Sequence, residues 1–445
     1  MSPQAETAQS SSGRPSHLAA RVAVGVLIAL VTAVMVGKYL HHDTKDVPVW
    51  YDVGGRVLNK QTLVGLTSYR YPPTFAVLIS PLCALPFAAF FFVWYAINVG
   101  LFFVAIRQTA HLTCSSRGTF RPEQTAGWAS FRPEAEALER CVPWPVAAIC
   151  AVYAIDNLFL GQTNLLVMVL LYGSFLYLLR RREWAAGVPL GLSIAVKVFT
   201  APMIAYLLYR RRWRAALSTV LSSLFFLLLF PAPFRGLDRN LAEVGDWGKR
   251  VVAPYLSKGK AGDWGQHALD LGNQSVQAVA HRYLRRVDAN VAARQSEPIY
   301  VNFAGLSESQ VNAIVLATFA VLAAVFVAAC GWRAPRTREQ EVTEYALVTI
   351  GLLLISAIAW TYFFVMLLLP LAVAVRLLAL THEPTVSHRR ALWFSVVAFG
   401  LVTVLLRLHY LRALGSVCFA SVLLYLALAG AVWTMRRGAD LPRLA

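Results

Sequence analysis

Charged side chains are scarce in this sequence. Asp, Glu, Lys and Arg make up 14% of its 445 residues, whereas hydrophobic residues make up 58%. Soluble globular domains carry roughly 25% charged residues, so this composition excludes a soluble globular protein with a polar surface. Long apolar runs separated by charged or proline-rich breaks are typical of membrane-spanning helices. We therefore expect an all-α, polytopic membrane protein.

Acidic residues are the scarcer of the charged kinds, with 23 Asp and Glu against 41 Lys and Arg, which gives a net charge of +18. Most arginine clusters lie at the ends of hydrophobic runs, where basic residues set membrane orientation. In a bilayer protein such an excess also contacts lipid phosphates. No basic segment is interleaved with aromatic residues as in a nucleic-acid-binding surface. We expect the membrane, and no nucleic acid, as a partner.

Several chemical motifs are missing. The sequence has no glycine-rich phosphate loop, no Walker motif and no dinucleotide fingerprint, which argues against a nucleotide-dependent reaction. We therefore expect no cofactor. No cysteine spacing suggests a zinc site, and Asp43 and Asp46 do not form the Asp-x-Asp pattern of many metal-dependent sugar transferases. We expect no metal.

The six cysteines fall into two groups. Four lie in apolar runs, where we expect small buried hydrophobic residues: Cys83, Cys150, Cys330 and Cys418. Cys114 and Cys141 bracket one loop that we place in an oxidising compartment. The spacing leaves open whether these two form a disulfide or remain free thiols.

The hydrophobic runs predict about twelve spanning helices. They lie near residues 20–39, 73–85, 87–107, 143–160, 163–179, 187–209, 215–231, 309–330, 343–358, 360–380, 391–407 and 413–434. Residues 1–17, rich in Ser, Gln, Ala and Pro, are expected to form a disordered cytoplasmic tail. Residues 18–445 are expected to form one transmembrane domain, with outer loops at residues 40–72, 108–142 and 232–308.

This topology conflicts with one tendency of membrane proteins. It leaves Arg107 to Arg140 and Arg180 to Arg182 outside, although basic residues favour the inside. One explanation is that the second span, at residues 73–85, does not cross fully. The other, which we favour, is that these arginines face an anionic lipid substrate at the outer surface.

The acidic, aromatic loop before residue 73 carries the strongest chemical signal. Asp43, Asp46 and Asp52 lie close together in it, and the loop ends in an arginine flanked by tyrosines, Arg70 and Tyr71 among them. Interfacial solvation explains most loop carboxylates. A carboxylate beside an arginine and tyrosines at a membrane surface nevertheless suits proton abstraction. We select Asp46 as the candidate general base.

Two charges lie within apolar runs, where an unpaired charge is costly. Lys197 is central in the run 190–208, from which its ammonium group reaches a membrane surface only with difficulty. Asp156 precedes a polar stretch at residues 161–164 that includes Gln162. Pairing within the bundle explains these polar groups better than a substrate role does. Lys197 and Asp156 together would also suit a proton relay.

The largest polar insert, residues 233–307, is too long for a connector, and we expect it to cap a site on the outer face. It contains an amphipathic stretch at residues 277–286. Asn273 and Gln274 offer amide groups suited to sugar hydroxyls, although a plain turn explains them nearly as well. Trp360 and Tyr362, at the junction of two spans, suit stacking on a sugar or a lipid groove, with an interfacial aromatic belt as the alternative.

Taken in order, these segments resemble glycosyltransferase family 87, the membrane transferases of the GT-C fold class that use polyprenyl-phosphate sugars. The resemblance runs nearly end to end. It rests on these residues: Asp46 with Trp50-Tyr51, Tyr69-Arg70-Tyr71-Pro72-Pro73, Pro81, Leu85-Pro86, Gly161-Gln162, Asn164, Lys197, Arg212-Trp213-Arg214, Gly272-Asn273-Gln274-Ser275, and Ser356 to Trp360. It implies a GT-C-like bundle of about 12 transmembrane helices, whose outer-face loops form the site.

The family resemblance also implies the reaction: an inverting transfer of a sugar, commonly mannose or arabinofuranose, from polyprenyl phosphate to a lipid or glycan acceptor. Asp46 would act as the base. Arg70, Lys197 and Tyr362 would contact the donor phosphate. Substrate contacts are expected from Tyr51, Tyr71, Gln162, Asn273, Gln274 and Trp360.

One segment departs from the family pattern. Family members often carry a histidine just after the tryptophan of the Ser-Pro-x-Ser-Trp segment, where this chain has Thr361, Tyr362 and Phe363. Ala357 stands in place of the proline. Tyr362 can donate a hydrogen bond to a phosphate oxygen, but it cannot supply positive charge.

We therefore expect a monomeric mannosyltransferase in the cell membrane, active on its outer face in making a cell-envelope glycan. The donor would be a lipid-linked sugar, and the acceptor a lipid or a glycan. The alternative is a secondary transporter or lipid flippase in which Lys197 and Asp156 relay a proton. That alternative predicts inverted repeats, and the sequence shows none.

Overall fold

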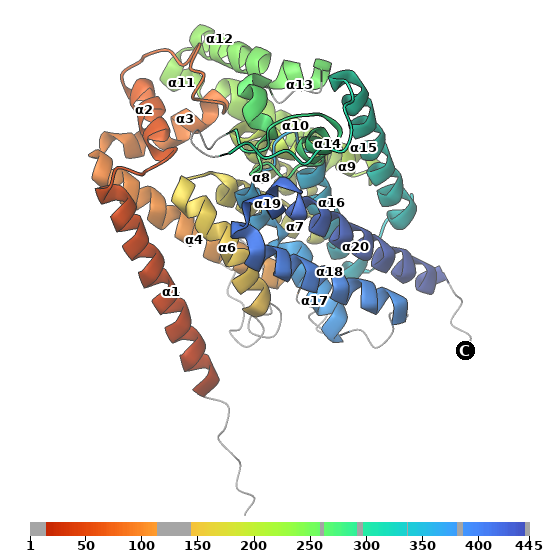
Figure 1. Cartoon of the computed structure of the whole chain (residues 1–445). Helices are drawn as coiled ribbons and strands as arrows, with labels where there is room; N and C mark the ends of the chain where they lie inside the picture. Colours follow the sequence, from red (N-terminus) through yellow and green to blue (C-terminus); the bar gives the residue numbers. More distant parts are fainter. Residues whose placement is uncertain are drawn as a thin grey trace, which may run out of the picture. The chain divides into compact units, whose positions relative to one another are not determined.

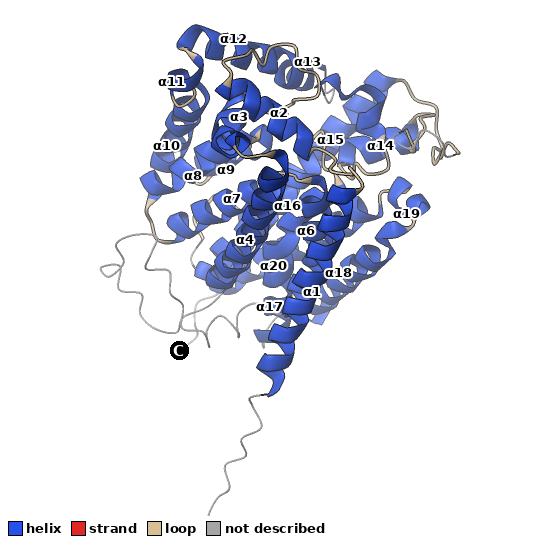
Figure 2. Cartoon of the chain, turned by 90° about the vertical axis from the view of Figure 1, so that its left-hand side faces the viewer, coloured by secondary structure: helices blue, strands red, loops and turns tan. Residues whose placement is uncertain are grey.

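The computed structural model describes residues 15–113, 144–258, 262–291, 297–335, 337–380 and 386–440. Within these ranges the regular structure is helical and contains no strand (Figure 2). One isolated bridge pairs Asn273 with Trp360. The expected all-α fold is confirmed. Cys114 and Cys141 lie outside the described residues.

The chain divides into two compact units, residues 1–45 and 46–445. The first contains helix α1 (Pro15–Leu40), so residues 15–17, expected in the tail, belong to a helix. Residues 1–14 lie outside the described part of the chain. Within this unit Asp43 pairs with Lys38 at 2.8 Å and with Lys45 at 2.6 Å. These two lysines lower the pKa of the Asp43 carboxyl.

The second unit holds the other helices labelled in Figure 1. They are α2 (Val47–Leu58), α3 (Pro73–Ile79), α4 (Phe87–Thr113), α6 (Trp144–Leu160), α7 (Asn164–Leu179), α8 (Glu183–Val196), α9 (Met203–Tyr209), α10 (Trp213–Leu224), α11 (Ala232–Arg235), α12 (Leu237–Trp247), α13 (Ala253–Lys258), α14 (Val276–Leu284), α15 (Glu308–Cys330), α16 (Arg338–Ile355), α17 (Leu368–Leu380), α18 (Val386–Val404), α19 (His409–Ala413) and α20 (Ser416–Asp440).

Six helical stretches in the described part of the chain are long and apolar enough to cross a bilayer. They are Phe87–Thr113, Trp213–Arg235, Glu308–Cys330, Thr361–Leu378, His388–Arg407 and Ser416–Arg437. Six shorter apolar stretches accompany them: Ala29–Leu40, Pro73–Ala84, Val146–Leu160, Asn164–Leu179, Glu183–Val196 and Val198–Tyr209. The chain is a polytopic membrane protein, and the expected count of about twelve spans stays a prediction.

The predicted span at residues 187–209 is wrong, because the chain reverses within it. Helix α8 ends at Val196, and Lys197 takes an extended backbone conformation (φ −154°, ψ 111°) before a short 3-10 turn and α9. Helices α8 and α10 then run parallel, since α8 approaches α10 closely at two successive turns. A Cβ atom on Gly187 would lie 2.4 Å from Ser218 Cβ, and one on Gly191 would lie 2.5 Å from Ser222 Cβ. Residues 197–209 therefore return the chain to the end where α8 began.

This reversal brings the two arginine-rich turns together, whereas one continuous span at residues 187–209 would have separated them. Arg212 in the α9–α10 turn donates a hydrogen bond to the Leu178 carbonyl beside the α7–α8 turn, at 3.0 Å. Arg212 and Arg181 both pair with Glu341 of α16. The apolar pattern could not reveal the reversal, because both arms of the hairpin are equally hydrophobic.

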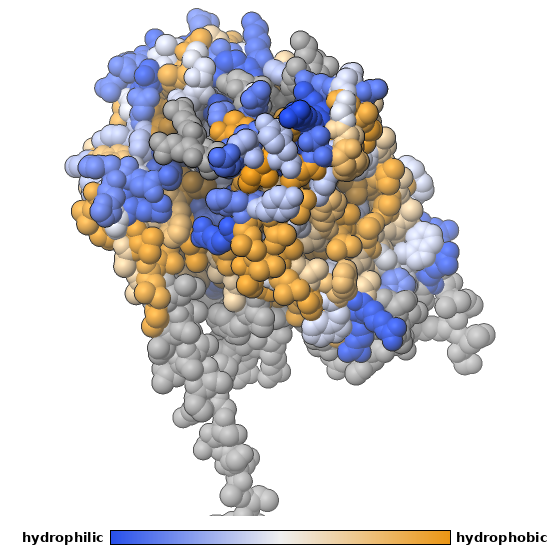
Figure 3. Space-filling view, in the orientation of Figure 1, coloured by the Kyte–Doolittle hydropathy of each residue, from blue (hydrophilic) through white to orange (hydrophobic). Residues whose placement is uncertain are grey.

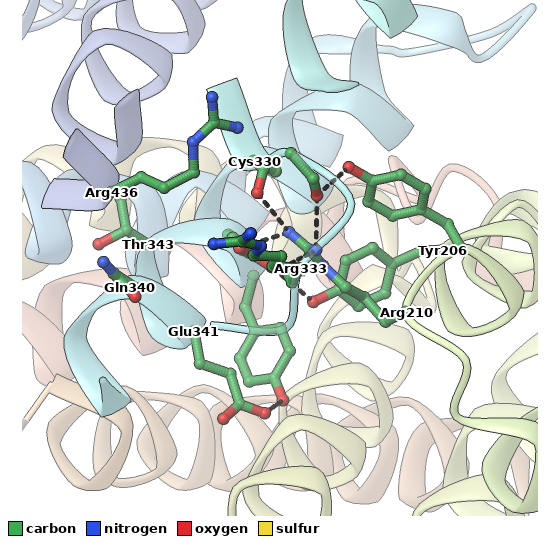
Figure 4. Close-up of polar contacts among 12 residues, drawn as sticks. Tyr206, Arg210, Cys330, Arg333, Gln340, Glu341, Thr343 and Arg436 are labelled. Atoms are coloured by element: carbon green, nitrogen blue, oxygen red, sulfur yellow. Dashed lines mark hydrogen bonds and ion pairs between the residues drawn. The ribbon is translucent and has the colours of Figure 1, made fainter. Parts of the chain in front are cut away.

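At this end, which we call the basic end of the bundle, buried ion pairs tie the α9–α10 turn to α16, and hydrogen bonds tie it to the α15–α16 connection (Figure 4). The Arg210 guanidinium contacts Glu344 Oε1 at 2.5 Å and donates to the Gly331 carbonyl at 2.8 Å. Arg338 donates to the carbonyl of His111, at the end of α4, at 2.6 Å. Residues 108–113 of the expected outer loop 108–142 thus belong to α4 and lie at the basic end.

The insert at residues 233–307 lies at the other end of the bundle. Both views place α11, α12 and α13 at one end and α17 at the other (Figures 1 and 2). The amphipathic stretch expected at residues 277–286 forms helix α14. Hydrophobic residues form a broad band below the more hydrophilic surface over α12 and α13 (Figure 3). Such a band matches a bilayer core bordered by water.

Candidate active site

A cavity of about 390 Å³ opens within the second unit, at the end of the bundle that carries the insert. Its walls come from the start of α2, the loop before α3, the α6–α7 turn, the break after α8, the segment after α12, and residues 355–363. Among the described residues that line it, the charged ones are Asp46, Arg70 and Lys197. One carboxylate and two cations therefore share an otherwise largely apolar and aromatic chamber.

The α6–α7 turn fixes one wall of the cavity. Gly161 ends α6 in the left-handed region (φ 66°), which glycine adopts without strain. A Cβ atom there would lie 2.4 Å from Val47 Cγ2, so the turn packs directly on the start of α2. The indoles of Trp50 and Trp94 both donate to the Gly161 carbonyl, at 2.8 and 2.9 Å. This clamp places Gln162 next to Asp46.

Asp46 stands at the N-cap position of α2, but its side chain makes no capping hydrogen bond. Its carboxylate instead accepts a hydrogen bond from the Gln162 amide. Gln162 Oε1 in turn accepts from the Tyr71 hydroxyl at 2.9 Å. Burial raises the pKa of the Tyr71 phenol, so this hydroxyl stays protonated as a donor. The pair Tyr71 and Gln162 orients the Asp46 carboxylate in the cavity.

Lys197 reaches the same network from the break after α8. Its ammonium group donates to Asn164 Oδ1 at 2.8 Å and lies 3.4 Å from the Tyr71 hydroxyl. It also stands 3.8 Å from the ring centroid of Phe363. Lys197 makes no ion pair with any described residue of the chain. Its charge is thus available to an anion that enters the cavity.

Three more of the expected residues line the cavity: Arg70, Trp360 and Tyr362. The Arg70 carbonyl accepts from the Trp247 indole at 3.1 Å, which joins the loop before α3 to α12. Thr361 donates its backbone N–H to the Gly272 carbonyl at 3.0 Å, next to the bridge that holds Trp360.

Asn273 and Gln274 do not line the cavity, although sequence analysis placed them at the substrate. Both are fully buried. Asn273 donates to the Ala357 carbonyl at 3.1 Å and accepts from the Ala359 N–H at 2.9 Å. Gln274 donates to the Arg412 carbonyl at 2.7 Å. In this structure these amides hold the backbone of the cavity-lining segment in place.

Tyr51 also lies away from the cavity lining. Its hydroxyl donates to the Leu85 carbonyl at 3.0 Å, and its ring packs on Phe87 and Phe90 with centroid distances of 5.2 Å. The Tyr51 side chain therefore points away from the cavity that Asp46 lines. A substrate role for Tyr51 stays a prediction.

The structure distinguishes the carboxylates that the sequence grouped together. Asp52 pairs with Arg56 one helical turn later, at 2.9 Å, and Asp43 pairs with its two lysines. Asp156 lies 3.9 Å from Arg407 rather than against Lys197, so the residues of the expected proton relay are not brought together. Asp46 is the one carboxylate among the described lining residues.

Metal-ligating side chains do not gather in the described part of the chain: no group of three or more His, Cys, Asp or Glu residues has the geometry to hold an ion. The four cysteines expected in apolar runs are buried free thiols, as predicted.

Sequence reasoning missed one wall of the cavity. Four residues from the end of α12 to α13 line it: Trp247, Val251, Val252 and Tyr255. The Tyr255 hydroxyl donates to the Ile355 carbonyl at 2.8 Å, which fixes this wall against the opposite one. The sequence spacing could have predicted this wall. These apolar residues are four, one and three positions apart within a polar insert, which is the spacing of residues on one face of a helix.

A helical membrane bundle that holds charged side chains in a largely apolar chamber is suited to an amphiphilic ligand. The model of glycosyltransferase family 87 matches residues 69–357, more than half of the chain. The chain belongs to this family and is a membrane glycosyltransferase. No curated protein and no solved structure matches it. Asp46 lies before the matched range, so the family match does not assign its role.

Proposed function

We propose that this protein transfers a sugar, mannose in the first instance, from a polyprenyl-phosphate donor to a lipid or glycan acceptor at the outer face of the cell membrane, with inversion at the anomeric carbon. The observation that carries the proposal is the cavity lining: one carboxylate, Asp46, lies with Lys197 and Arg70 in a largely apolar chamber. Such a lining supports deprotonation of an acceptor hydroxyl together with binding of a lipid phosphate.

The general-base step is assigned to Asp46. The acceptor hydroxyl transfers its proton to the Asp46 carboxylate as its oxygen attacks the anomeric carbon and the bond to the phosphate oxygen breaks. Gln162 holds the carboxylate by its amide, while the Tyr71 hydroxyl fixes Gln162. A retaining mechanism with a covalent intermediate uses a second carboxyl group. A lining with one carboxylate therefore favours a single displacement, and with it inversion.

The leaving phosphate is assigned to Lys197, Arg70 and Tyr362. Charge that develops on the phosphate during bond breaking is stabilised by cations held in a low-dielectric site. The Lys197 ammonium has no ion-pair partner in the described chain, and the side chains of Arg70 and Tyr362 line the same chamber. A polyprenyl phosphate leaves without help from a metal or a protonated acid, because the phosphate is already a good leaving group.

The outer-face assignment follows from the charge distribution. The α7–α8 turn, the α9–α10 turn and the start of α16 meet at the basic end, with the end of α4 beside them. Basic residues favour the cytoplasmic side. The cavity lies at the opposite end of the bundle, and this arrangement supports an outward-facing site. Under this proposal Arg180 to Arg182 lie on the inner side. The short α3 and the course of α4 from Tyr51 to the basic end support the explanation that residues 73–85 do not cross fully, rather than the favoured one of an anionic lipid substrate at these arginines.

The experiment that tests this function is a transfer assay with purified wild-type protein. The reaction contains radiolabelled polyprenyl-phosphate mannose and a membrane lipid extract, with polyprenyl-phosphate arabinofuranose and a nucleotide-linked mannose as parallel donors. We expect labelled product from the mannose lipid donor. NMR of this product should show the anomeric configuration opposite to that of the donor. Product from the nucleotide donor alone, or retention of configuration, would contradict the proposal.

A further inference from the structure

A second hollow, of about 630 Å³, lies at the basic end, where the α7–α8 turn meets the α9–α10 turn. Its lining residues are Arg181, Arg182, Glu183, Trp184, Ala185, Arg211, Trp213 and Arg214. Four guanidinium groups against one carboxylate leave this hollow with positive charge, which favours an anionic ligand. We propose that the hollow binds the phosphate headgroup of an anionic phospholipid.

The hollow is separate from the Asp46 cavity. Helix α8 begins at Glu183 in the hollow and ends at Val196, directly before Lys197 in the cavity. Its 14 residues span about 21 Å at 1.5 Å per residue. That separation approaches the roughly 30 Å thickness of the hydrocarbon core of a bilayer. The hollow therefore faces the membrane leaflet opposite to the one at the cavity.

Two of the four guanidinium groups are available to a ligand. Arg211 and Arg214 are exposed and make no hydrogen bond or ion pair within the described part of the chain. Arg181 contacts Glu341 at 3.3 Å but stays 67% exposed. Arg212 lies between Arg211 and Arg214 in the sequence but differs from them, because its side chain is buried against Glu341 and stabilises the fold. One arginine of this turn, Arg212, thus stabilises the fold, whereas its neighbours Arg211 and Arg214 line the hollow.

The backbone at the two turns supports a use for these side chains. Arg181 and Arg211 both adopt the left-handed conformation, with φ of 59° and 55°. Each is the second residue after its helix, α7 or α9, in a position that glycine fills with less strain. Turn formation alone would favour glycine at both positions. Arginine at both instead supplies two long cationic side chains to one hollow.

The surroundings favour a lipid over a soluble anion. Trp184 and Trp213 are 53% and 61% exposed at the rim, as tryptophans at a membrane interface are. Leu217 and Leu221 follow Trp213 at intervals of four on the same face of α10 and are 50% and 51% exposed. This apolar strip leads from the hollow along the helix. A phospholipid can place its phosphate among the arginines and its acyl chains along the strip.

Native mass spectrometry of the full-length protein in detergent tests the proposal, with equimolar phosphatidylglycerol and phosphatidylcholine. The test variant is the double substitution Arg211→Gln/Arg214→Gln. The matched control is Arg389→Gln/Arg390→Gln, which removes two exposed arginines elsewhere in the described chain. We expect wild type and control to retain phosphatidylglycerol in preference to phosphatidylcholine. In the test variant this preference should fall about fivefold for each arginine removed.

Three results would overturn the proposal. Wild type could retain both lipids equally, or the control could lose as much preference as the test variant, which would reduce the effect to overall charge. Inorganic phosphate at millimolar concentration could displace phosphatidylglycerol as fully as excess lipid does, which would identify a soluble anion as the ligand. The melting temperature in phosphatidylcholine nanodiscs checks folding, and Arg214→Gln alone replaces the double variant if that variant unfolds.

Discussion

At the scale of single residues, the cavity depends on what each carboxylate and amide contacts. Asp46 is distinguished from Asp43 and Asp52 by its partners, since the other two pair with basic residues near them in the chain. The pairing of Asp52 with Arg56 could be predicted from the spacing i, i+4 on one helix. The link from Asp46 to Gln162 could not, because 116 residues separate them.

The Lys197 ammonium is expected to hold the donor phosphate. Hydrogen bonds to charged groups contribute about 1.5–3 kcal/mol, so Lys197→Met should raise the KM for the donor roughly 10- to 150-fold. The melting temperature should fall modestly, because Lys197→Met removes the hydrogen bond to the buried Asn164 Oδ1 but breaks no ion pair in the described chain. Steady-state kinetics on Lys197→Met and on the exposed control Lys249→Met measure both effects. A donor KM within twofold of wild type would remove Lys197 from the phosphate site.

Asn273 is expected to act through the backbone it holds and not through substrate. Asn273→Ala removes two hydrogen bonds to the half-buried segment at residues 357–359, and leaves the Ala357 carbonyl and the Ala359 N–H without this partner. Such losses cost on the order of 3 kcal/mol of stability. Thermal unfolding in detergent should show a lower melting temperature together with lower activity. Direct substrate binding would instead raise the KM for a substrate while the melting temperature stayed at the wild-type value.

At the scale of elements, the sequence predicted most helices but not how α8, α9 and α10 connect. Apolar runs locate helices because each must hide its backbone from lipid. A reversal inside an apolar run leaves hydrophobicity unchanged, so the break at Lys197 was read as part of one span. Pro202 and the charge of Lys197 were the local signals of a break. The parallel contact of α8 with α10 was visible only in three dimensions.

The close contact of α8 with α10 depends on glycine at residue 191. A Cβ atom there would lie 2.5 Å from Ser222 Cβ and 2.8 Å from the backbone N of Ser223. Gly191→Ala should therefore destabilise the protein by about 1–3 kcal/mol through overpacking. Gly100→Ala, where a Cβ atom meets nothing within 4 Å, is the matched control and should have no such effect. Thermal unfolding compares the two, and equal melting temperatures would refute the tight packing.

At the scale of the whole molecule, family membership and membrane character were predictable from the order of short motifs and from composition. Sidedness was not, because counting residues 73–85 as a full span puts Arg180 to Arg182 on the outside. In the structure these residues form the short helix α3 and a 3-10 turn, and α4 starts beside Tyr51 and ends at the basic end. The structure brings those arginines beside Arg212 at the basic end. The proposal that the cavity at the other end faces outward uses the same rule of charge.

The orientation is expected to show in cysteine labelling of intact cells. In a cysteine-free background, Ser309→Cys should react with a membrane-impermeant maleimide from outside, since residue 309 starts α15 at the cavity end. Arg390→Cys, in the first turn of α18, should react only after permeabilisation. The reverse pattern would place the cavity on the cytoplasmic side.

Asp46 is proposed to be the catalytic base in the cavity of this glycosyltransferase. The most direct test is sugar transfer by Asp46→Asn, beside Asp52→Asn as a carboxylate outside the cavity, with donor binding measured in parallel. Removal of a general base lowers rates about 10²- to 10⁴-fold. We predict such a loss for Asp46→Asn with donor binding retained, and near wild-type transfer for Asp52→Asn. Wild-type transfer by Asp46→Asn would contradict the account.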